Sequence, residues 1–188
     1  ILDLKVNTVI DIGGNDGTFV RKITSKLSHA LVCDIDNNAI DINYKKTKLN
    51  NETFIAHFIL DVLNPSASIG FNSTERFSFL KRIKDFAPDV TLALAVIHHM
   101  SLSGNVPFSE SAKFFSSFSK HLIIEFPKRE DSWVQRLLNN KADFKDHFDF
   151  YNVKNFEKAY NEVFDIIERK TIEETERVIY LLKLKSNE

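Results

Sequence analysis

The stretch from Val9 to Phe19 constrains the fold most, because an apolar run passes there into a glycine-rich turn and then into a predicted helix. The apolar run is rich in β-branched residues, which buried strands favour. Three glycines follow within five positions; they permit positive φ and leave bare backbone that a ligand can approach: Gly13, Gly14 and Gly17. The first N–H groups of the next helix would have no partner within the helix. The stretch therefore predicts a strand, a ligand-binding loop and a helix.

The spacing of this loop separates it from the common dinucleotide-binding loop. From Asp11 it reads Asp-x-Gly-x-x-x-Gly, whereas nicotinamide enzymes use Gly-x-Gly-x-x-Gly. Asn15 lies between the glycines, and asparagine tolerates positive φ better than most residues. A tight strand-to-helix turn without a ligand is the alternative interpretation of the loop on these residues alone.

Composition narrows the protein class. A chain of 188 residues with 43% hydrophobic content suits one compact domain, which we place at residues 1–188. The formal net charge of −1 gives no basic field for nucleic acid or anionic membrane. The single cysteine, Cys33, predicts a buried thiol in a reducing, cytoplasmic setting. The longest apolar run, Val90 to Ile97, is too short to span a bilayer.

Strand-like and helix-like segments alternate along the chain, as a parallel sheet covered by helices requires. Five strands are expected: Val9–Ile12, Ala30–Cys33, Phe54–Leu60, Val90–Ile97 and Leu122–Phe126. The first expected helix follows the glycine-rich turn and has an apolar face of Phe19, Ile23 and Leu27, and the second has an apolar face of Ile40, Tyr44 and Leu49. Further helices are expected at 77–84, 109–118, 133–138 and 156–164. Two last strands, Phe164–Ile172 and Val178–Leu184, are separated by a hairpin-length connection. The fold class expected is α/β and Rossmann-like, with seven mostly parallel strands, helices on both faces and a C-terminal antiparallel β-hairpin.

Acidic residues end the first three predicted strands, and strand ends are where open α/β sheets bind ligands. Asp34 follows Asp11 by 34 − 11 = 23 residues, one strand-helix-strand unit later. A carboxylate there can accept hydrogen bonds from both hydroxyls of a ribose. Asp61 ends the third strand, and Asp36 is expected to cap the next helix. The alternative interpretation of Asp34 is an ordinary loop acid.

Together these residues resemble motif I and the following acids of class I S-adenosylmethionine (SAM)-dependent methyltransferases, with Asn15 in place of the usual middle glycine. The His98-His99 pair and the block Glu125-Phe126-Pro127-Lys128 resemble a subgroup that includes nodulation-type methyltransferases. The resemblance implies SAM as cofactor, S-adenosylhomocysteine as product, and Asp61 as the adenine acid with the Val62 N–H nearby. Such enzymes carry helices before the first strand, which residues 1–188 are expected to lack. The cofactor-binding residues so implied are Asp11, Gly13, Gly14, Asn15, Gly17, Asp34, Ile35, Asp61, Val62 and Ala95.

A methyl acceptor that is a hydroxyl or a protonated amine must lose a proton, so a base is needed. The candidates are His99, His98 and Glu125. Adjacent histidines point in different directions in regular structure, so one of them can instead bind backbone. The resemblance favours His99 over His98.

The function expected is methyl transfer from SAM to an oxygen or nitrogen atom of a small molecule. A protein or RNA methyltransferase and a SAM-binding module without catalysis are the alternatives. A nicotinamide oxidoreductase shares the first strand and loop but fits the loop spacing and the terminal hairpin poorly. No metal ligand set or membrane partner is expected, the sequence gives no strong nucleic-acid signal, and it does not indicate an oligomeric state.

Overall fold

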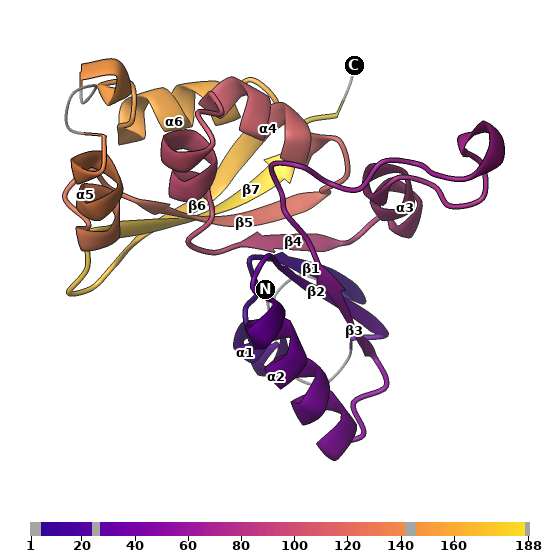
Figure 1. Ribbon diagram of the computed structural model, residues 1–188. Helices are drawn as coiled ribbons and strands as arrows, with labels where there is room; N and C mark the ends of the chain where they lie inside the picture. The colour runs from indigo at the N-terminus through magenta and orange to yellow at the C-terminus, as the bar shows by residue number, and fades with distance from the viewer. Residues whose placement is uncertain (1–4, 24–26, 142–145, 187–188) are drawn as a thin grey trace. The chain divides into compact units, whose positions relative to one another are not determined.

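The computed structural model describes residues 5–23, 27–141 and 146–186 of the chain. Seven strands form one sheet in the order β3-β2-β1-β4-β5-β7-β6 (Figure 1). The strands are β1 Thr8–Ile12, β2 His29–Asp34, β3 Ile55–Ile59, β4 Val90–Ala93, β5 His121–Pro127, β6 Phe164–Ile172 and β7 Arg177–Leu184. β1 pairs parallel with β2 and β4, and β2 pairs parallel with β3, whereas β7 is antiparallel to both β5 and β6. The predicted mostly parallel sheet with a C-terminal hairpin is confirmed.

The helices alternate with the strands up to β5 and then cluster before the hairpin. They are α1 Thr18–Lys22, α2 Asn37–Leu49, α3 Phe79–Phe86, α4 Phe108–Ser116, α5 Ser132–Asn139 and α6 Val153–Tyr160. The described residues also include shorter helices, among them a 3-10 helix at Phe71–Ser73 and a π-helix at His99–Ser103. None of the helices within the described ranges has the length and apolar character needed to cross a membrane.

Several predicted element ends are wrong. The fourth strand was expected to reach Ile97, but β4 ends at Ala93 because the chain turns at Leu94 and Ala95, where φ of Ala95 is +54°. The last predicted helix ends at Tyr160, and Phe164 instead begins β6. Hydrophobicity alone did not reveal the turn, since the apolar run continues through it.

Two predicted helix faces are also wrong. α1 ends at Lys22 and buries Val20, while Phe19 is 49% exposed. α2 is capped by Asp36, as predicted, but it buries Ala39, Ile40, Asn43 and Thr47 and leaves Tyr44 and Leu49 exposed. The buried face of α2 thus includes two polar residues, and apolar periodicity could not identify it.

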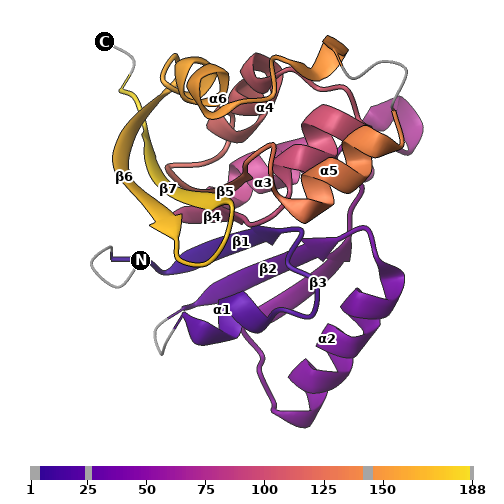
Figure 2. The same cartoon turned by 90° about the vertical axis from the view of Figure 1, so that its left-hand side faces the viewer.

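The chain divides into two compact units, which are described separately. The first comprises residues up to Leu92 together with Phe118–Lys120. Its core is formed by β1 and β2 with residues of the helices, among them Val9, Ile10, Val32, Cys33 and Ile83. The thiol of Cys33 is fully buried, as predicted, and burial raises its pKa well above the usual value. α1 and α2 lie side by side (Figure 2), and α2 contacts β2 and β3.

The second unit comprises Ala93–Ser117 and His121–Glu188 and has a core of aromatic side chains. The antiparallel register places Phe126 and Tyr180 on one face of β5 and β7, where both are fully buried. Phe108 of α4 packs edge-on against Phe126, and Phe156 of α6 packs against Tyr180, so α4 and α6 cover the same face. Residues that alternate with these point to the opposite face, and they include Glu125 and Arg177.

Candidate functional site

The glycine-rich loop of the first unit is closed by backbone contacts. The N–H groups of Gly13 and Gly14 both donate to the carbonyl of Cys33 at the end of β2, at 2.8 and 3.0 Å. Gly13 and Gly17 have φ of +73°, and Asn15 has φ of +47°. Positive φ at these positions is the conformation expected from the sequence, and asparagine substitutes for glycine at the middle one.

Asp34 ties this loop to the next strand-to-helix turn. One carboxylate oxygen accepts a hydrogen bond from the Asn15 N–H at 2.9 Å, and the other accepts from the Asp36 N–H at 2.9 Å. The structure therefore places the predicted ribose acid directly beside the predicted cofactor loop. Asp34 is half-buried, so its carboxylate is also open to solvent.

Asp11 lies beneath the loop as a buried acid. Its side chain is nearly inaccessible, and neither carboxylate oxygen has a hydrogen-bond partner in the structure. Burial, with a smaller contribution from the charge of Asp34, raises the pKa of Asp11 to about 7. A Cβ atom at Gly14 would lie 2.7 Å from the carboxyl carbon of Asp11 and 2.8 Å from a methyl carbon of Val32. Gly14 is thus required for close packing on Asp11, whereas Gly13 and Gly17 are required for positive φ.

The remaining predicted cofactor residues of the first unit follow β2 and β3. Ile35 is 65% exposed, so most of its apolar side chain faces solvent. Asp61 and Val62 are half-buried after the end of β3, and one oxygen of Asp61 accepts a hydrogen bond from the Leu63 N–H. The loop, Asp34 and Asp61 all follow carboxyl ends of parallel strands that pair in the order β3-β2-β1, so they share one edge of this part of the sheet.

In the second unit, Ala95 and the histidine pair lie in the turn and helix that follow β4. His98 is 2% exposed, whereas His99 is exposed, and their ring centroids are 4.2 Å apart. Nδ1 of His98 is buried without a hydrogen-bond partner. Burial, then the nearby His99 and Arg177, lower the pKa of His98 to about 3. His98 is therefore a neutral buried ring at physiological pH, and His99 is the histidine that solvent and ligands can reach.

Glu125, the third predicted base, forms an ion pair on the face of β5 opposite the aromatic core. Arg177 donates from Nη1 to Oε1 of Glu125 at 2.7 Å and from Nε to Oδ2 of Asp131 at 2.7 Å. The register pairs Glu125 with Ile179 and Pro127 with Arg177, so Glu125 and Arg177 are diagonal neighbours on one face. Asp131 also caps α5 by accepting from the Trp133 N–H.

The sequence did not assign roles to Arg177 and Asp131. Although burial opposes ionisation of Asp131, hydrogen bonds from Arg177 and the Trp133 N–H hold its pKa below the usual value. The antiparallel register was the missing signal, because it determines which residue of β7 reaches Glu125. An acid in the middle of an apolar strand required a cationic partner, and the hairpin supplies it.

The aromatic residues before α6 belong to the core. Tyr151 is fully buried, stacks on Phe126 and donates its hydroxyl to the carbonyl of Pro127 at 2.9 Å. Phe148 is buried and Phe150 packs against Phe108. The buried rings make this part of the segment core.

Comparison with known proteins gives relatives of two kinds. The chain is 31% identical over 177 residues to the nodulation protein NoeA of Rhizobium meliloti (strain 1021), a match that covers 94% of the chain. It spans about a third of that relative, 36% of its length. No family model matches the chain.

Solved structures share the fold at lower identity. The N-methyltransferase NodS of Bradyrhizobium japonicum WM9, in complex with S-adenosylhomocysteine, matches with a TM-score of 0.63 and 14% identity over 96% of this chain and 79% of NodS. An O-methyltransferase family protein of Burkholderia thailandensis matches with a TM-score of 0.62 and 15% identity over 98% of this chain and 52% of that protein. The bifunctional kinase-methyltransferase WbdD matches with a TM-score of 0.63 and 14% identity over 94% of this chain and 34% of WbdD.

Proposed function

We propose that this chain, which has the fold of the class I SAM-dependent methyltransferase family, binds SAM and transfers its methyl group to an oxygen or nitrogen atom of a small molecule. The observation that carries the proposal is the junction of the glycine-rich loop with Asp34, where the Asn15 N–H meets the carboxylate at 2.9 Å. NodS, which shares this fold, was solved with S-adenosylhomocysteine bound, and that supports the choice of cofactor.

The residues of the first unit fit an adenosine-containing cofactor. Asp34 offers carboxylate oxygens to a ribose, and Asp61 with the Val62 N–H offers an acceptor and a donor to an adenine edge. The exposed side chain of Ile35 would gain from covering the adenine ring. The backbone of Gly13, Asn15 and Gly17 permits close approach of the cofactor's methionine portion.

When bound, SAM would supply a methyl group on a sulfonium for in-line transfer to the acceptor atom, with S-adenosylhomocysteine as the leaving group. The chain must then orient the acceptor and accept its proton. His99 is the proposed base because it is exposed, whereas His98 is buried and neutral. Glu125 is held in an ion pair by Arg177, so we rank it after His99 as the proposed base. A SAM-binding module without catalysis and a protein or RNA methyltransferase are the competing functions.

Calorimetry with SAM, S-adenosylhomocysteine and NADH tests the cofactor. We expect the first two to bind and NADH not to bind. Asp34→Ala should weaken SAM binding by roughly 2–4 kcal/mol, since paired ribose hydroxyls lose their acceptor, and Gly13→Val should abolish binding because a branched side chain disfavours positive φ. The control is Asp41→Ala, which removes an exposed acid of α2 that pairs with Lys45. Normal SAM binding by Gly13→Val would show that the loop does not hold the cofactor.

Methyl transfer is tested with tritiated SAM and separate pools of small amines, small hydroxyl compounds, peptides and RNA. Label in a small-molecule product, identified by mass, is the expected result. Label confined to peptide or RNA would assign the alternative acceptor class. Tight SAM binding with no label in any pool would favour the module without catalysis.

A further inference from the structure

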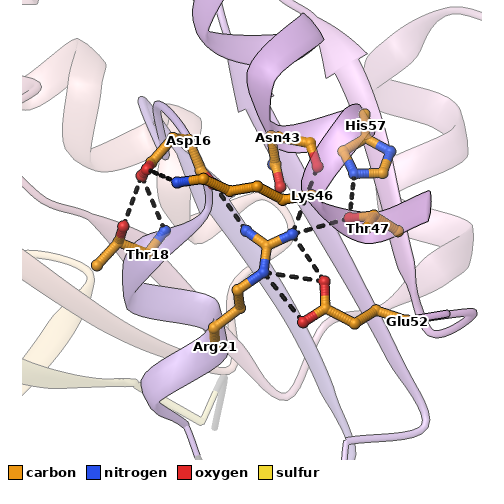
Figure 3. A network of polar contacts seen from close by, with 8 residues as sticks. All are labelled: Asp16, Thr18, Arg21, Asn43, Lys46, Thr47, Glu52 and His57. Atoms are coloured by element: carbon orange, nitrogen blue, oxygen red, sulfur yellow. Dashed lines mark hydrogen bonds and ion pairs between the residues drawn. The ribbon is translucent and has the colours of Figure 1, made fainter. Parts of the chain in front are cut away.

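Arg21 of α1 is the centre of a polar network in the first unit (Figure 3). Its Nη1 donates to the backbone carbonyl of Asp16, inside the glycine-rich loop, at 2.7 Å. Its Nε donates to both carboxylate oxygens of Glu52, at 2.9 and 3.1 Å, and its Nη2 donates to Glu52 and to the Thr47 hydroxyl, each at 2.8 Å. One guanidinium therefore joins the loop to α2 and to the turn before β3.

The pair of Arg21 and Glu52 has the geometry of a strong ion pair. Both side chains are 18% exposed, and the contacts run from two guanidinium nitrogens to one carboxylate. Two parallel charge-assisted hydrogen bonds fix direction as well as distance, which a lysine ammonium cannot do. The hydrogen bonds from Arg21 lower the pKa of Glu52, so this carboxylate stays charged.

Thr47 extends the network to β3. Its hydroxyl accepts from Arg21 and lies 2.9 Å from Nε2 of His57. Burial, followed by the charge of Arg21, lowers the pKa of His57, so the ring is neutral at physiological pH. The Thr47 hydroxyl can then donate its proton to Nε2, which orients its lone pairs towards Arg21.

Asp16, the loop residue that Arg21 binds through its carbonyl, is also held through its side chain. Lys46 of α2 donates to one carboxylate oxygen at 2.5 Å, and the Thr18 hydroxyl donates to the other at 2.6 Å. The hydrogen bond from Lys46, then that from Thr18, lower the pKa of Asp16 to about 2. The side chain of Asp16 is thus tied to α2 through Lys46, and its backbone carbonyl is tied to Arg21 of α1.

Gly17 packs directly on the same network. A Cβ atom at Gly17 would lie 2.7 Å from the Asn43 amide oxygen and 2.8 Å from Nη1 of Arg21. Because α1 has only five residues, its own helical hydrogen bonds cannot hold the loop that precedes it. The guanidinium and the α2 side chains provide the rigid surface on which the loop lies.

We propose that Arg21 is a positioning residue, which holds the Asn15–Gly17 turn in the conformation that binds SAM, with Glu52 and Thr47 fixing the direction of its guanidinium. The inference rests on the proposed function for its choice of ligand. A loop that is already in its binding conformation loses less conformational entropy when the ligand arrives. Loss of the Arg21 guanidinium should therefore loosen the loop and weaken cofactor binding without changing any group that contacts the cofactor.

Four variants test the role of Arg21: Arg21→Met, Arg21→Lys, Glu52→Gln and Asp89→Ala. The last is the matched control, because Asp89 accepts hydrogen bonds from the Asn7 and Thr8 N–H groups and from Lys120 at the opposite end of β1. The first measurement is S-adenosylhomocysteine affinity by calorimetry, at a temperature where every variant is fully folded. The second is amide hydrogen exchange of Asp16 and Gly17 in the free protein.

We expect Arg21→Met to weaken the binding of S-adenosylhomocysteine by about tenfold or more, since charge-assisted contacts to the loop are lost. The same variant should speed amide exchange at Asp16 and Gly17. Arg21→Lys and Glu52→Gln should show smaller changes of the same sign, and Arg21→Lys remains informative if Arg21→Met fails to fold. Asp89→Ala should lower the melting temperature while affinity and loop exchange stay at parental values.

Two results would overturn the inference. One is parental affinity and parental loop exchange in both Arg21 variants, and the other is an equal loss of affinity in Asp89→Ala, which would indicate general destabilisation. If the parent protein does not bind S-adenosylhomocysteine, the proposed function fails instead. Loop exchange in the free protein then still decides whether Arg21 holds the turn.

Discussion

The glycine-rich loop of the first unit and the polar cluster of the second, formed by Glu125, Asp131 and Arg177, are built in different ways. In the loop, backbone N–H groups of Gly13, Gly14 and Gly17 donate to backbone carbonyls, and the nearby acid Asp11 has no hydrogen-bond partner. In the polar cluster the side chains pair with one another, and Arg177 serves two carboxylates. A site formed by backbone groups depends on particular residues at fixed spacing in the sequence. A site formed by paired side chains depends on residues far apart in the sequence that strand pairing brings together.

The first way to sharpen this comparison is to remove the charge of Asp11. Its folded pKa of about 7 exceeds the ordinary 3.8, so between these values the folded state binds a proton that the unfolded state has released. The free energy of unfolding should therefore fall as pH rises from about 4 to 7, by at most about 4 kcal/mol. Asp11→Asn should lack this fall, which urea unfolding across that pH range measures.

Asp34→Asn is the control for the Asp11 experiment, because it changes a half-buried acid of the same loop whose oxygens already have N–H partners. It should keep most of the pH dependence of the parent, because burial is the larger cause of the raised pKa of Asp11, and lose the smaller part that the charge of Asp34 contributes. If the unfolding free energy of Asp11→Asn changed with pH as steeply as that of the parent, Asp11 would ionise without a cost to stability.

The sequence predicted the loop region more fully than the polar cluster. Of the loop residues that could take positive φ, Gly13, Asn15 and Gly17 have it and Gly14 does not. Asp34 and Asp61 end the predicted strands. The resemblance to class I methyltransferases is confirmed at the level of the fold. These features depend on local spacing, which a sequence displays directly.

The polar cluster depended on contacts between distant residues. Arg177 lies 52 positions from Glu125, and only the antiparallel register of β5 and β7 joins them. The early end of β4 was missed for a related reason, since the turn at Ala95 consists of apolar residues. The catalytic roles of His98, His99 and Glu125 stay predictions.

The second prediction compares the two histidines. His99→Ala should lower the methyl-transfer rate by about 10²-fold while SAM affinity stays nearly unchanged, since that is a usual contribution of a general base. His98→Ala should mainly lower the melting temperature, because it empties a buried position. Single-turnover rates with saturating SAM measure the difference. A parental rate for His99→Ala together with a slow Glu125→Gln would move the role of base to Glu125.

The third prediction breaks the ion-pair cluster of the second unit. Arg177→Met leaves Glu125 and Asp131 without their shared cation, and we expect a loss of about 2 kcal/mol in unfolding free energy, reduced from a fully buried case because Arg177 is partly exposed. SAM affinity should stay at the parental value. The control Lys170→Met breaks an exposed pair with Glu168 on β6, and it should change stability little. Equal stability of both variants would show that the cluster adds nothing to the fold.

The smallest expected effect concerns two alanines with the same backbone strain. Ala95 follows β4 with φ of +54°, and Ala87 ends α3 with φ of +48°. Replacement of either by glycine should raise stability by about 0.5–1 kcal/mol, because the left-handed conformation costs alanine more than glycine. Thermal unfolding measures both changes.

Of the two alanines, only Ala95 was predicted to bind the cofactor. Comparison of the two substitutions therefore tests whether backbone strain at Ala95 is needed for cofactor binding or only for the turn. Strained backbone persists where its surroundings hold it, and such positions are frequent at binding sites. Ala95→Gly should raise stability but weaken SAM binding, because the turn before His98 becomes more flexible. Ala87→Gly should raise stability and leave SAM binding unchanged. If both variants bind SAM as the parent does, the turn after β4 is strained for packing, and Ala95 leaves the set of cofactor residues.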